Sequence, residues 1–347
     1  MAIYMKHEEK TAVSSGRMEI NMAISKNITI KQIAAKANVS TATASRAINQ
    51  PGTVKEETRN RVLQAMKELD FQIKRTSNKV ILASFTDFVN PFYGDCIVGM
   101  QAAAKRRGYQ LFLQQTENPE NPTSYEFLIN SKLYQGVVFC HSIPTGETLA
   151  SIKMKYPVVM CSQYNSESDI PYVAIDDCAA AKKAINYLVS IGRKRIAFIN
   201  STLNHSYSVF REMGFREALK EAELPVQENW IAHVEEIDFA VAFSAAKTLL
   251  SKTCIPDAIF CASDVFASAA VKAAHSLNLS IPEDVAVMGF DNVCLTTMTT
   301  PTISTVSQPT YQLGYQSCSL LIDEIEGNPV MNRRIILPTE IVVRSST

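Results

Sequence analysis

From residue 80 onward, short apolar segments alternate with amphipathic helical segments almost to the end of the chain. Segments such as 80–85 and 258–261 have the length and side-chain bulk of buried strands, and the stretches between segments repeat apolar residues at helical spacing. Alternation of this kind predicts parallel sheets covered by helices on both faces. The predicted strands are 80–85, 111–114, 136–140, 158–161, 172–175, 195–200, 258–261 and 285–290.

This number of strands is better accommodated by two lobes than by one open sheet. We expect lobe 1 to contain about 80–176 and 308–327, and lobe 2 to contain about 177–307 and 332–343. Ligands of such sheets bind at the carboxyl ends of the strands. The crevice between two facing lobes is therefore the predicted ligand site of the core, which spans 80–347.

Ahead of this core, residues 28–71 carry the signals of three short helices. The first begins at Thr29, which has the spacing of a capping box with Gln32, and the second, 41–48, follows a two-residue turn. The third is expected to start at a second capping box, formed with Glu56, and to end near residue 70. Two helices joined by so short a turn must cross, as they do in a helix-turn-helix.

Charge is unevenly distributed, although the formal net charge of the whole chain is zero. Residues 26–79 hold eleven Lys and Arg against four Asp and Glu, a net charge of +7. Residues 1–25 hold three charges of each sign, so residues 80–347 carry a net charge of about −7. A basic head on an acidic body indicates a nucleic-acid-binding module attached to a second functional part.

The second helix has the side chains that a recognition helix uses. Thr41 and Ala42 lie in its first turn, where base edges are read, and Arg46 one turn later can reach a base or a phosphate. Short polar side chains around these positions are candidates for phosphate contacts. They are Thr29, Ser40, Thr43, Ser45, Asn49 and Thr53. The same composition suits an ordinary helical turn, so the interpretation depends on the basic charge and on the capping boxes as well.

The segments TIKQIAAKANVSTATASRAIN and TVKEETRNRVLQAMKELDF are similar to the headpiece of the LacI/GalR family of bacterial repressors. The resemblance continues to residue 344 through NPFYGDCIVGMQAAAKRRGY, IPEDVAVMGFDN and TISTVSQP, among other segments. It implies a small all-α helix-turn-helix headpiece, an α/β core with two lobes like those of periplasmic binding proteins, and a homodimer that binds double-stranded operator DNA. Within the family, STATASRA, FDNVCLT and IVVRSST resemble a nucleoside-responsive member.

The joint between headpiece and core departs from the family pattern. Family members usually have a short helix there, with a leucine that wedges into the minor groove and kinks the operator. Residues 72–79 are shorter than this helix and contain no leucine, although Ile73 could substitute for it. We expect a flexible basic tether, with Lys74 and Arg75 on phosphates. Residues 1–27 show no sustained periodicity and are expected to be a disordered tail.

Seven core side chains are candidates for contact with a small-molecule effector. Phe92 and Tyr93 follow a strand and can stack on a flat ring or a sugar face, although both also suit core packing. The resemblance implies that Arg211 donates hydrogen bonds to the ligand and that Asp291 accepts them. The remaining candidates are Asp176, Phe239 and Asp264, and the last of these could instead cap a helix.

The ligand itself stays open between two classes. A ribonucleoside suits an aromatic side chain combined with an arginine and an aspartate, and so does a pentose or a hexose. Where related pockets carry a tryptophan after the fourth strand, this chain has the sequence Ser-Gln-Tyr at 162–164, and Asp177 replaces the commoner asparagine of the family. The nucleoside is the expected effector, and a sugar is the alternative.

Other features of the chain limit its function class. Eight cysteines lie far apart with no C-x-x-C pair, and we interpret them as reduced, buried thiols without metal or redox chemistry. No apolar run approaches the length of ~20 residues that a membrane span needs, and the start MAIYMKHEEK lacks the apolar centre of a signal peptide. We expect a cytoplasmic protein with no membrane partner.

Three function classes suit a two-lobed core: an effector-controlled repressor, a sugar-binding protein without a regulatory role, and a nucleoside- or sugar-processing enzyme. The helix-turn-helix favours the repressor. An enzyme would need a nucleophile, a metal cluster or a phosphate-binding loop, and the sequence has no G-x-x-x-x-G-K-[ST] or H-E-x-x-H pattern. We therefore predict no catalytic residues, no metal and no cofactor.

Overall fold

The computed structural model describes residues 29–49, 54–69, 79–141, 144, 146–164, 168–235 and 237–347. The chain divides into two units, Met1–Arg75 and Thr76–Thr347. The boundary falls within the linker expected at 72–79, of which only Lys79 is among the described residues. The tail expected at 1–27 lies outside them.

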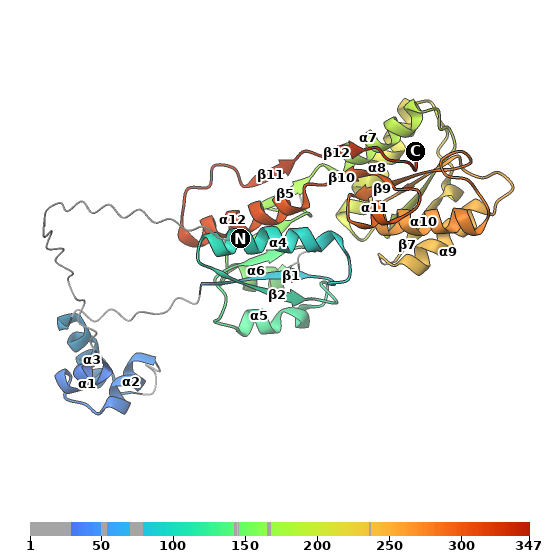
Figure 1. Cartoon of the computed structure of the whole chain (residues 1–347). Helices are drawn as coiled ribbons and strands as arrows, with labels where there is room; N and C mark the ends of the chain where they lie inside the picture. Colours follow the sequence, from blue (N-terminus) through green and yellow to red (C-terminus); the bar gives the residue numbers. More distant parts are fainter. Residues whose placement is uncertain are drawn as a thin grey trace, which may run out of the picture. The chain divides into compact units, whose positions relative to one another are not determined.

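The described part of the first unit consists of helices α1 (Ile30–Lys36), α2 (Thr41–Asn49) and α3 (Glu56–Glu68) (Figure 1). The backbone N–H of Thr29 donates to Oε1 of Gln32 at 2.7 Å, as the capping-box spacing predicts. Helix α3 begins at Glu56 with Lys55 as its N-cap, which is later than a cap at Thr53 would give. Thr53 itself lies outside the described residues.

The headpiece has a small core to which all three helices contribute. Its buried members are Ile33, Ala37, Ala47, Val62, Ala65 and Met66. An ion pair between Nζ of Lys36 and Glu68 (3.2 Å) joins α1 to α3 at the surface. Helix α2 therefore has one side packed against its neighbours and the other side facing solvent.

The second unit contains two six-stranded sheets, one for each lobe. The first sheet has the order β11-β5-β4-β3-β1-β2, and its pairings are parallel. Its strands are β1 (Val80–Phe85), β2 (Gln110–Gln115), β3 (Val137–Phe139), β4 (Val158–Cys161), β5 (Tyr172–Ile175) and β11 (Arg334–Leu337). Helices α4 (Phe92–Arg106) and α12 (Thr310–Glu326) cover one face, and η2 (Pro122–Tyr125), α5 (Glu126–Asn130) and α6 (Gly146–Lys153) cover the other (Figure 1).

The second sheet has the order β12-β10-β9-β8-β6-β7. Its strands are β6 (Ile196–Ser201), β7 (Ile231–Val234), β8 (Ala258–Cys261), β9 (Ala286–Asp291), β10 (Ser304–Ser307) and β12 (Glu340–Val342), and only β12 pairs antiparallel, with β10. The accompanying helices are α7 (Asp177–Ser190), α8 (Ser206–Glu221), η3 (Glu228–Trp230), α9 (Phe239–Leu250), α10 (Asp264–Ser276) and α11 (Leu295–Met298). This architecture is the expected α/β core with parallel sheets.

The lobe division differs from the prediction at the end of the chain. The expected second lobe included 332–343, but β11 pairs parallel with β5 in the first sheet, and only β12 belongs to the second. The chain therefore crosses between the lobes three times, near Asp176, near Gln308 and between β11 and β12. Strand β11 alternates exposed and half-buried residues at the sheet edge, so it lacks the continuous apolar run that marks an inner strand.

Helices α4 and α12 pack at unusually close range over the first sheet. A Cβ atom on Gly314 would lie 1.9 Å from the backbone oxygen of Cys96, and one on Gly99 would lie 2.1 Å from that of Tyr311. Glycine is thus required on both helices for the backbones to approach. No atom lies within 4 Å of a Cβ placed on Gly94, which is also in α4.

We predict that Gly314→Ala lowers the free energy of unfolding of the core by about 1–3 kcal/mol, because the new methyl group overpacks the crossing of α4 and α12. Gly94→Ala should leave the free energy unchanged or raise it by about 0.5–1 kcal/mol, as alanine does in a helix. Urea unfolding followed by circular dichroism measures both. Equal effects of the two substitutions would contradict the close crossing.

Candidate DNA-binding and effector sites

Helix α2 presents to solvent the side chains that were predicted to read bases. Thr41, Ala42 and Arg46 are exposed, whereas Ala44 and Ala47 are buried against the other helices. A helix can enter a DNA groove only with an unpacked side, and α2 has one on which these three residues lie. The predicted base-reading residues therefore share the accessible side of one helix.

The predicted phosphate contacts are in varied surroundings. Oγ of Ser40 caps α2 by accepting from the backbone N–H of Thr43 (3.0 Å), and it also hydrogen-bonds the Thr43 hydroxyl (2.8 Å). Thr29 is exposed, and its hydroxyl donates to Gln32 at 3.1 Å, while Ser45 is half-buried. Asn49 ends α2, and its side chain, like Thr53, lies outside what is described.

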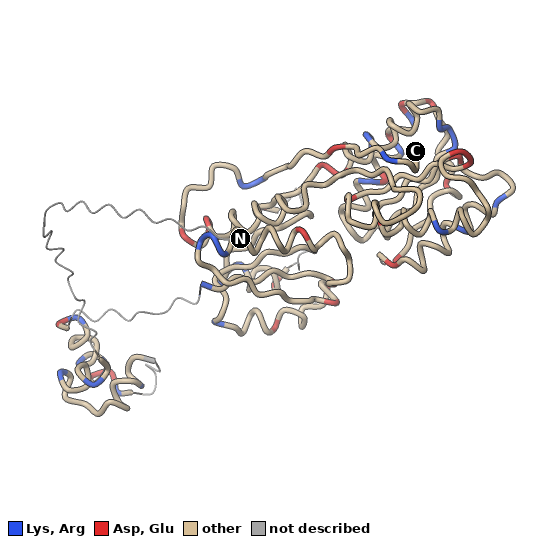
Figure 2. Tube along the Cα trace, viewed as in Figure 1, with Lys and Arg blue, Asp and Glu red and all other residues tan. Residues whose placement is uncertain are grey.

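The described headpiece is basic. Residues 29–49 and 54–69 contain seven Lys and Arg and three Glu, and Figure 2 shows such positions along the helices of the headpiece. One of the three Glu, Glu68, is paired with Lys36. A surplus of positive charge on a small helical unit attracts the phosphates of a polyanion independently of its sequence.

A cavity of about 720 Å³ lies between the two lobes, at the carboxyl ends of the strands of both sheets. In lobe 1 its lining includes Thr86, which follows β1, and His141, which follows β3. In lobe 2 it includes Asp291 at the end of β9 and Gln308 after β10. The cavity has the size of a small-molecule site and the position that parallel sheets favour for one.

Four of the seven predicted effector contacts line this cavity: Phe92, Tyr93, Arg211 and Asp291. Phe92 and Tyr93 lie in the first turn of α4, are buried, and pack edge to face with ring centroids 5.5 Å apart. The hydroxyl of Tyr93 donates to the backbone oxygen of Cys140 (3.3 Å), and burial raises its pKa well above the usual value. The aromatic wall is thus fixed by packing before any ligand binds.

Arg211 is held on several sides. Its Nε donates to Oδ1 of Asp177 (2.8 Å), and its Nη1 donates to the backbone oxygen of Ala262 (2.5 Å). The guanidinium carbon lies 3.6 Å from the ring centroid of Phe290 and 5.0 Å from that of Tyr207. Within the part of the chain that the structure describes, Nη2 makes no hydrogen bond, so it is the donor that this arginine can offer to a ligand.

Asp291 is buried beside this arginine, with Oδ1 3.9 Å from Nη1 of Arg211. Nε2 of Gln308 donates to the same oxygen at 2.7 Å. Burial raises the pKa of Asp291 to about 7, although Arg211 and Gln308 favour the charged form. Its backbone φ of +113° is strained for any residue with a side chain, and strain of this kind is often found at functional sites.

The structure does not place the other three predicted contacts in the cavity lining. Asp176 is exposed and caps α7 by accepting from the backbone N–H of Ala179 (2.9 Å). The ring of Phe239 is partly exposed under Nζ of Lys272. Asp264 is fully buried and does not line the cavity.

Asp264 is fully buried, with its two carboxylate oxygens accepting from the hydroxyl of Thr305 (2.7 Å) and the backbone N–H of Val293 (2.8 Å). A Cβ on Gly289 would lie 2.2 Å from its Oδ1, so the carboxylate sits directly against strand β9. Burial, together with the nearby Asp291, raises its pKa well above the usual value. These contacts are structural, but they are not the helix cap given as the alternative, because the N-cap of α10 is Ser263.

Several lining residues were not identified from the sequence. They include His141, Gln163, Tyr207 and Gln308. The hydroxyl of Ser84 hydrogen-bonds Nε2 of His141 at 2.8 Å, and the ring of Tyr207 stacks on that of His205 (5.3 Å, 9°). His141 and Gln308 each follow a strand, which is a usable signal, whereas the position of Tyr207 depends on how α8 packs.

An aromatic stack joins the two lobes next to the cavity. The ring of Tyr164, after β4, lies between Tyr172 of β5 (4.7 Å, 16°) and Phe210 of α8 (5.7 Å, 11°). Beside it, the hydroxyl of Ser206 donates to Gln163 at 3.5 Å. The segment that stands where related pockets carry a tryptophan thus contacts the opposite lobe.

The cysteine prediction needs one correction. Cys96, Cys140, Cys161, Cys261 and Cys318 are buried and unpaired, as predicted, but Cys254 and Cys294 are exposed and Cys178 is half-buried. Cys254 lies in the turn after α9, and Cys294 lies directly before the short helix α11, so neither is in a sheet. Among the described residues, no group of three His, Cys, Asp or Glu side chains could hold a metal ion.

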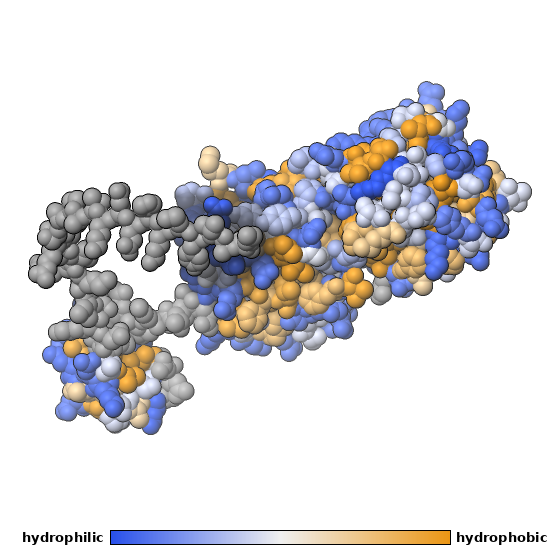
Figure 3. All heavy atoms as spheres, viewed as in Figure 1, coloured by the Kyte–Doolittle hydropathy of each residue, from blue (hydrophilic) through white to orange (hydrophobic). Residues whose placement is uncertain are grey.

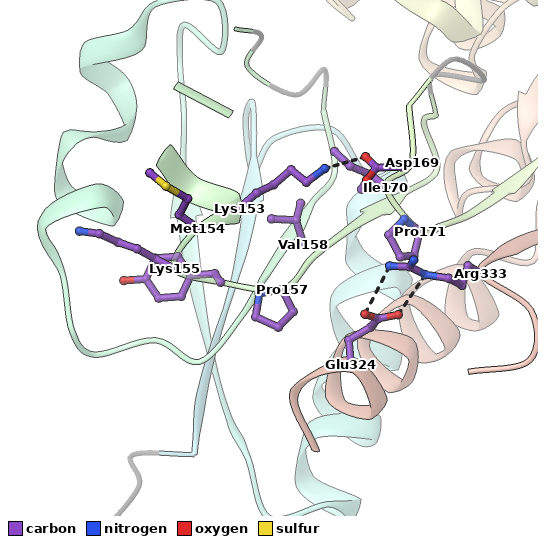
Figure 4. A pocket seen from close by; sticks show the side chains of 11 residues that line it. Lys153, Met154, Lys155, Pro157, Val158, Asp169, Ile170, Pro171, Glu324 and Arg333 are labelled. Carbon is purple, nitrogen blue, oxygen red and sulfur yellow. Dashed lines mark hydrogen bonds and ion pairs between the residues drawn. The ribbon is translucent and has the colours of Figure 1, made fainter. Parts of the chain in front are cut away.

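A second hollow, of about 340 Å³, lies at the amino ends of β4 and β5 (Figure 4). Two cations in its lining already have carboxylate partners: Lys153 pairs with Asp169 (2.6 Å) and Arg333 with Glu324 (3.1 Å). This is the edge of the sheet opposite to the one where parallel strands bind ligands. Its lining includes the buried Tyr156, but the hydroxyl of this residue is already bonded to the backbone oxygens of Leu128 and Ser131.

Comparisons with known proteins agree with this architecture. Residues 29–73 match the bacterial regulatory proteins of the lacI family, and residues 185–347 match a periplasmic binding protein-like domain. The HTH-type transcriptional repressor CytR of Escherichia coli is 31% identical over 92% of this chain and 96% of its own length. The ribose operon repressor of Halalkalibacterium halodurans is 33% identical over 92% and 97%. The solved complex of transcriptional regulator CelR with cellobiose has a TM-score of 0.71 at 28% identity, covering 92% of this chain and all of the other.

A helix-turn-helix headpiece followed by a two-lobed binding core defines a class of transcription regulators. The chain belongs to the LacI family of bacterial regulatory proteins and is a transcriptional repressor of that family. Its relatives are named as repressors and regulators, not as enzymes, in agreement with the prediction that the chain is not an enzyme. None of the helices that the structure describes is long and apolar enough to cross a membrane.

We predict that Asp291→Asn stabilises the protein more at pH 8 than at pH 5. Because the pKa of Asp291 is raised to about 7, its proton stabilises the folded state fully below the unfolded pKa near 4, and this stabilisation is lost as the pH rises through 7. The asparagine cannot ionise, so the difference in Tm from the unaltered protein should grow across this range.

Asp95→Asn is the matched control, because Asp95 is exposed on α4. Its effect on Tm should not grow between pH 5 and pH 8. A constant difference for Asp291→Asn as well would show that Asp291 is not the buried, proton-binding carboxyl described above.

Proposed function

We propose that this repressor acts in the cytoplasm by binding double-stranded operator DNA through α2, and that a small molecule bound between its lobes changes its affinity for that DNA. The observation that carries the proposal is the exposed side of α2, on which Thr41, Ala42 and Arg46 lie together in a basic headpiece. Thr41 and Ala42 would contact base edges and Arg46 a base or a phosphate. Thr29, Ser40, Thr43, Ser45, Asn49 and Thr53 would contact phosphates.

The effector that we propose is a nucleoside. Its flat base would stack on the aromatic wall of Phe92 and Tyr93, and its ribose hydroxyls would meet Arg211 and Asp291. Nη2 of Arg211 supplies a donor, and the carboxylate of Asp291 supplies acceptors. The sequence likeness to a nucleoside-responsive family member supports this assignment.

A sugar is the second candidate, and the printed names of two similar proteins support it. Two of the similar proteins carry a sugar in their names, the ribose operon repressor and the CelR–cellobiose complex. A sugar would bind the same arginine and aspartate, but it has no base to stack on Phe92 and Tyr93. Ligand-binding measurements therefore decide between the two classes.

Linkage between effector and operator binding requires two lobe arrangements with different operator affinities. The lobes are joined by three crossovers and by the stack of Tyr172, Tyr164 and Phe210. Because both lobes line the cavity, a ligand bound there would change how the two lobes are arranged relative to each other. An effector that contacts both lobes would favour one arrangement over the other.

We further propose that the protein acts as a homodimer formed through the core. Large apolar side chains are exposed on lobe 1, including Val98 of α4 and Phe112 and Leu113 of the edge strand β2. Figure 3 shows apolar side chains gathered on this lobe. Exposed patches of this kind mark interaction sites, and a dimer would match two headpieces to a pseudopalindromic operator.

Residues 72–78 of the expected tether lie outside the described residues, and the proposal about the tether depends on its sequence. Without a leucine to wedge into the minor groove, more of the binding would come from headpiece charge and dimer spacing. Operator affinity should then fall steeply as the salt concentration rises.

We predict that Arg46→Ala weakens binding to a promoter fragment from the protein's own genomic neighbourhood by about 5- to 150-fold, corresponding to ~1–3 kcal/mol. Fluorescence anisotropy at several salt concentrations measures this. Arg61→Ala removes the same charge from α3 and should have the smaller effect. If no promoter fragment shows salt-dependent binding by the unaltered protein, the regulatory proposal fails.

We predict that Asp291→Ala abolishes the effector response while operator binding is retained. A ligand at 100 times its Kd raises the free energy of unfolding by about 2.7 kcal/mol, so a thermal-shift screen beginning with cytidine and adenosine, followed by sugars, would identify the effector. Asp176→Asn, which keeps a side chain able to cap α7, is the control and should respond normally. An unchanged response of Asp291→Ala would remove Asp291 from the site.

A further inference from the structure

We infer that the cavity between the lobes admits uncharged ligands and rejects their phosphate esters, so that the effector is a free nucleoside or sugar and not a nucleotide or sugar phosphate. The inference rests on the proposed effector site and specifies the charge of what it binds. It is carried by the distribution of charged and capping groups around the cavity.

The first step concerns positive charge. Among the described residues that line the cavity, Arg211 is the only Lys or Arg. Its charge is already balanced within the protein, because Asp177 accepts from Nε at 2.8 Å and Asp291 lies 3.9 Å from Nη1. Burial lowers the pKa of His205, which also lines the cavity, so that imidazole supplies no charge near neutral pH. Among the described lining residues, a dianionic phosphate would therefore meet no Lys or Arg whose charge is not already paired.

The second step concerns negative charge at the mouth of the cavity. Four carboxylates belong to the lining besides Asp291, and we call them the acidic rim: Asp87 and Glu117 from lobe 1, and Glu235 and Asp238 from lobe 2. Asp87 is half-buried, and the other three are exposed. An anion entering between the lobes would pass carboxylates on both sides, and like charges brought together at a binding surface strongly disfavour association.

The third step concerns helix N-termini, which are the usual phosphate-binding elements in α/β folds. At three of those that border this cavity, a side chain of the protein accepts a hydrogen bond from one backbone N–H of the first turn. Oδ1 of Asn90 accepts from Phe92 in α4, Oδ1 of Asp238 accepts from Val241 in α9, and Oγ of Ser263 accepts from Phe266 in α10. Each of these caps removes one backbone donor that a phosphate oxygen could use, whereas α8, whose N-cap His205 lines the cavity, has no side-chain cap.

The uncapped groups that remain are suited to hydroxyl recognition. Nη2 of Arg211 is a donor, and the carboxylate of Asp291 accepts. The hydroxyl of Ser162 and the amide of Gln163 line the lobe 1 side. These groups bind neutral polar ligands without requiring a countercharge.

Calorimetric titration of the full-length protein with matched pairs tests the inference. The pairs are cytidine with cytidine 5′-monophosphate, adenosine with adenosine 5′-monophosphate, and ribose with ribose 5-phosphate. For each pair whose neutral member binds, we expect the phosphate ester to bind at least about 10-fold more weakly. An ester that binds within 10-fold of its neutral partner, or more tightly, overturns the inference while leaving the effector site intact. If no member of any pair binds, the proposed nucleoside or sugar effector fails, and the inference fails with it.

The contribution of the rim is tested separately with Glu117→Gln/Glu235→Gln, which removes one charge from each lobe. The Kd of the phosphate ester divided by the Kd of its neutral partner should fall by at least about 3-fold, because the rim repels only the charged ester. Glu283→Gln removes an exposed charge that does not line the cavity, and its ratio should be unchanged. An unchanged ratio in the double variant overturns the role assigned to the rim.

Discussion

The buried guanidinium of Arg211 is the interaction on which the arrangement of the second lobe at the cavity depends. A buried charge is tolerated only when it is paired and hydrogen-bonded. Its partners come from the first turn of α7, from the loop after β8 and from the end of β9. One side chain therefore ties three segments together at the point where the chain has just crossed from lobe 1.

The ionic partner of this arginine also shapes what the cavity can bind. The family resemblance implies an asparagine more commonly at the position of Asp177, and in the structure Asp177 is buried against Arg211. An amide would leave the guanidinium charge available to a ligand, whereas a carboxylate neutralises it within the protein. The preference for an uncharged effector that we infer follows from this exchange together with the acidic rim.

The contacts between the lobes are of a different kind. The stack of Tyr172, Tyr164 and Phe210 is apolar and flat, so it can slide or separate without leaving a buried charge unpaired. Its central ring follows Ser162, which has a left-handed φ of +64°. A rigid, ion-paired wall in one lobe and an adaptable aromatic contact to the other are the properties that an effector-dependent change of lobe arrangement requires.

Much of the fold and part of the site follow from local patterns. The alternation of strands and helices predicts the parallel sheets, and a residue directly after a buried strand must lie at the crevice, which is why Asp291 was identified. The pattern identifies the edge strand β2 but misses β7, β10, β11 and β12. β10 has the sequence STVS and β11 alternates in exposure, so neither presents the apolar run by which the inner strands were recognised.

The sequence alone determined the helix-turn-helix and the parallel core, because periodicity and capping are local properties, and the family resemblance implied an arginine and an aspartate at the cavity. Only the tertiary structure decided between Asp264 and Asp291. Both end similar segments, FCASD and MGFD, but Gly289 leaves room for the carboxylate of Asp264 beneath β9, where Thr305 of β10 binds it. That outcome depends on the order of strands in the sheet, which places residues distant in the chain side by side, and no local pattern encodes it.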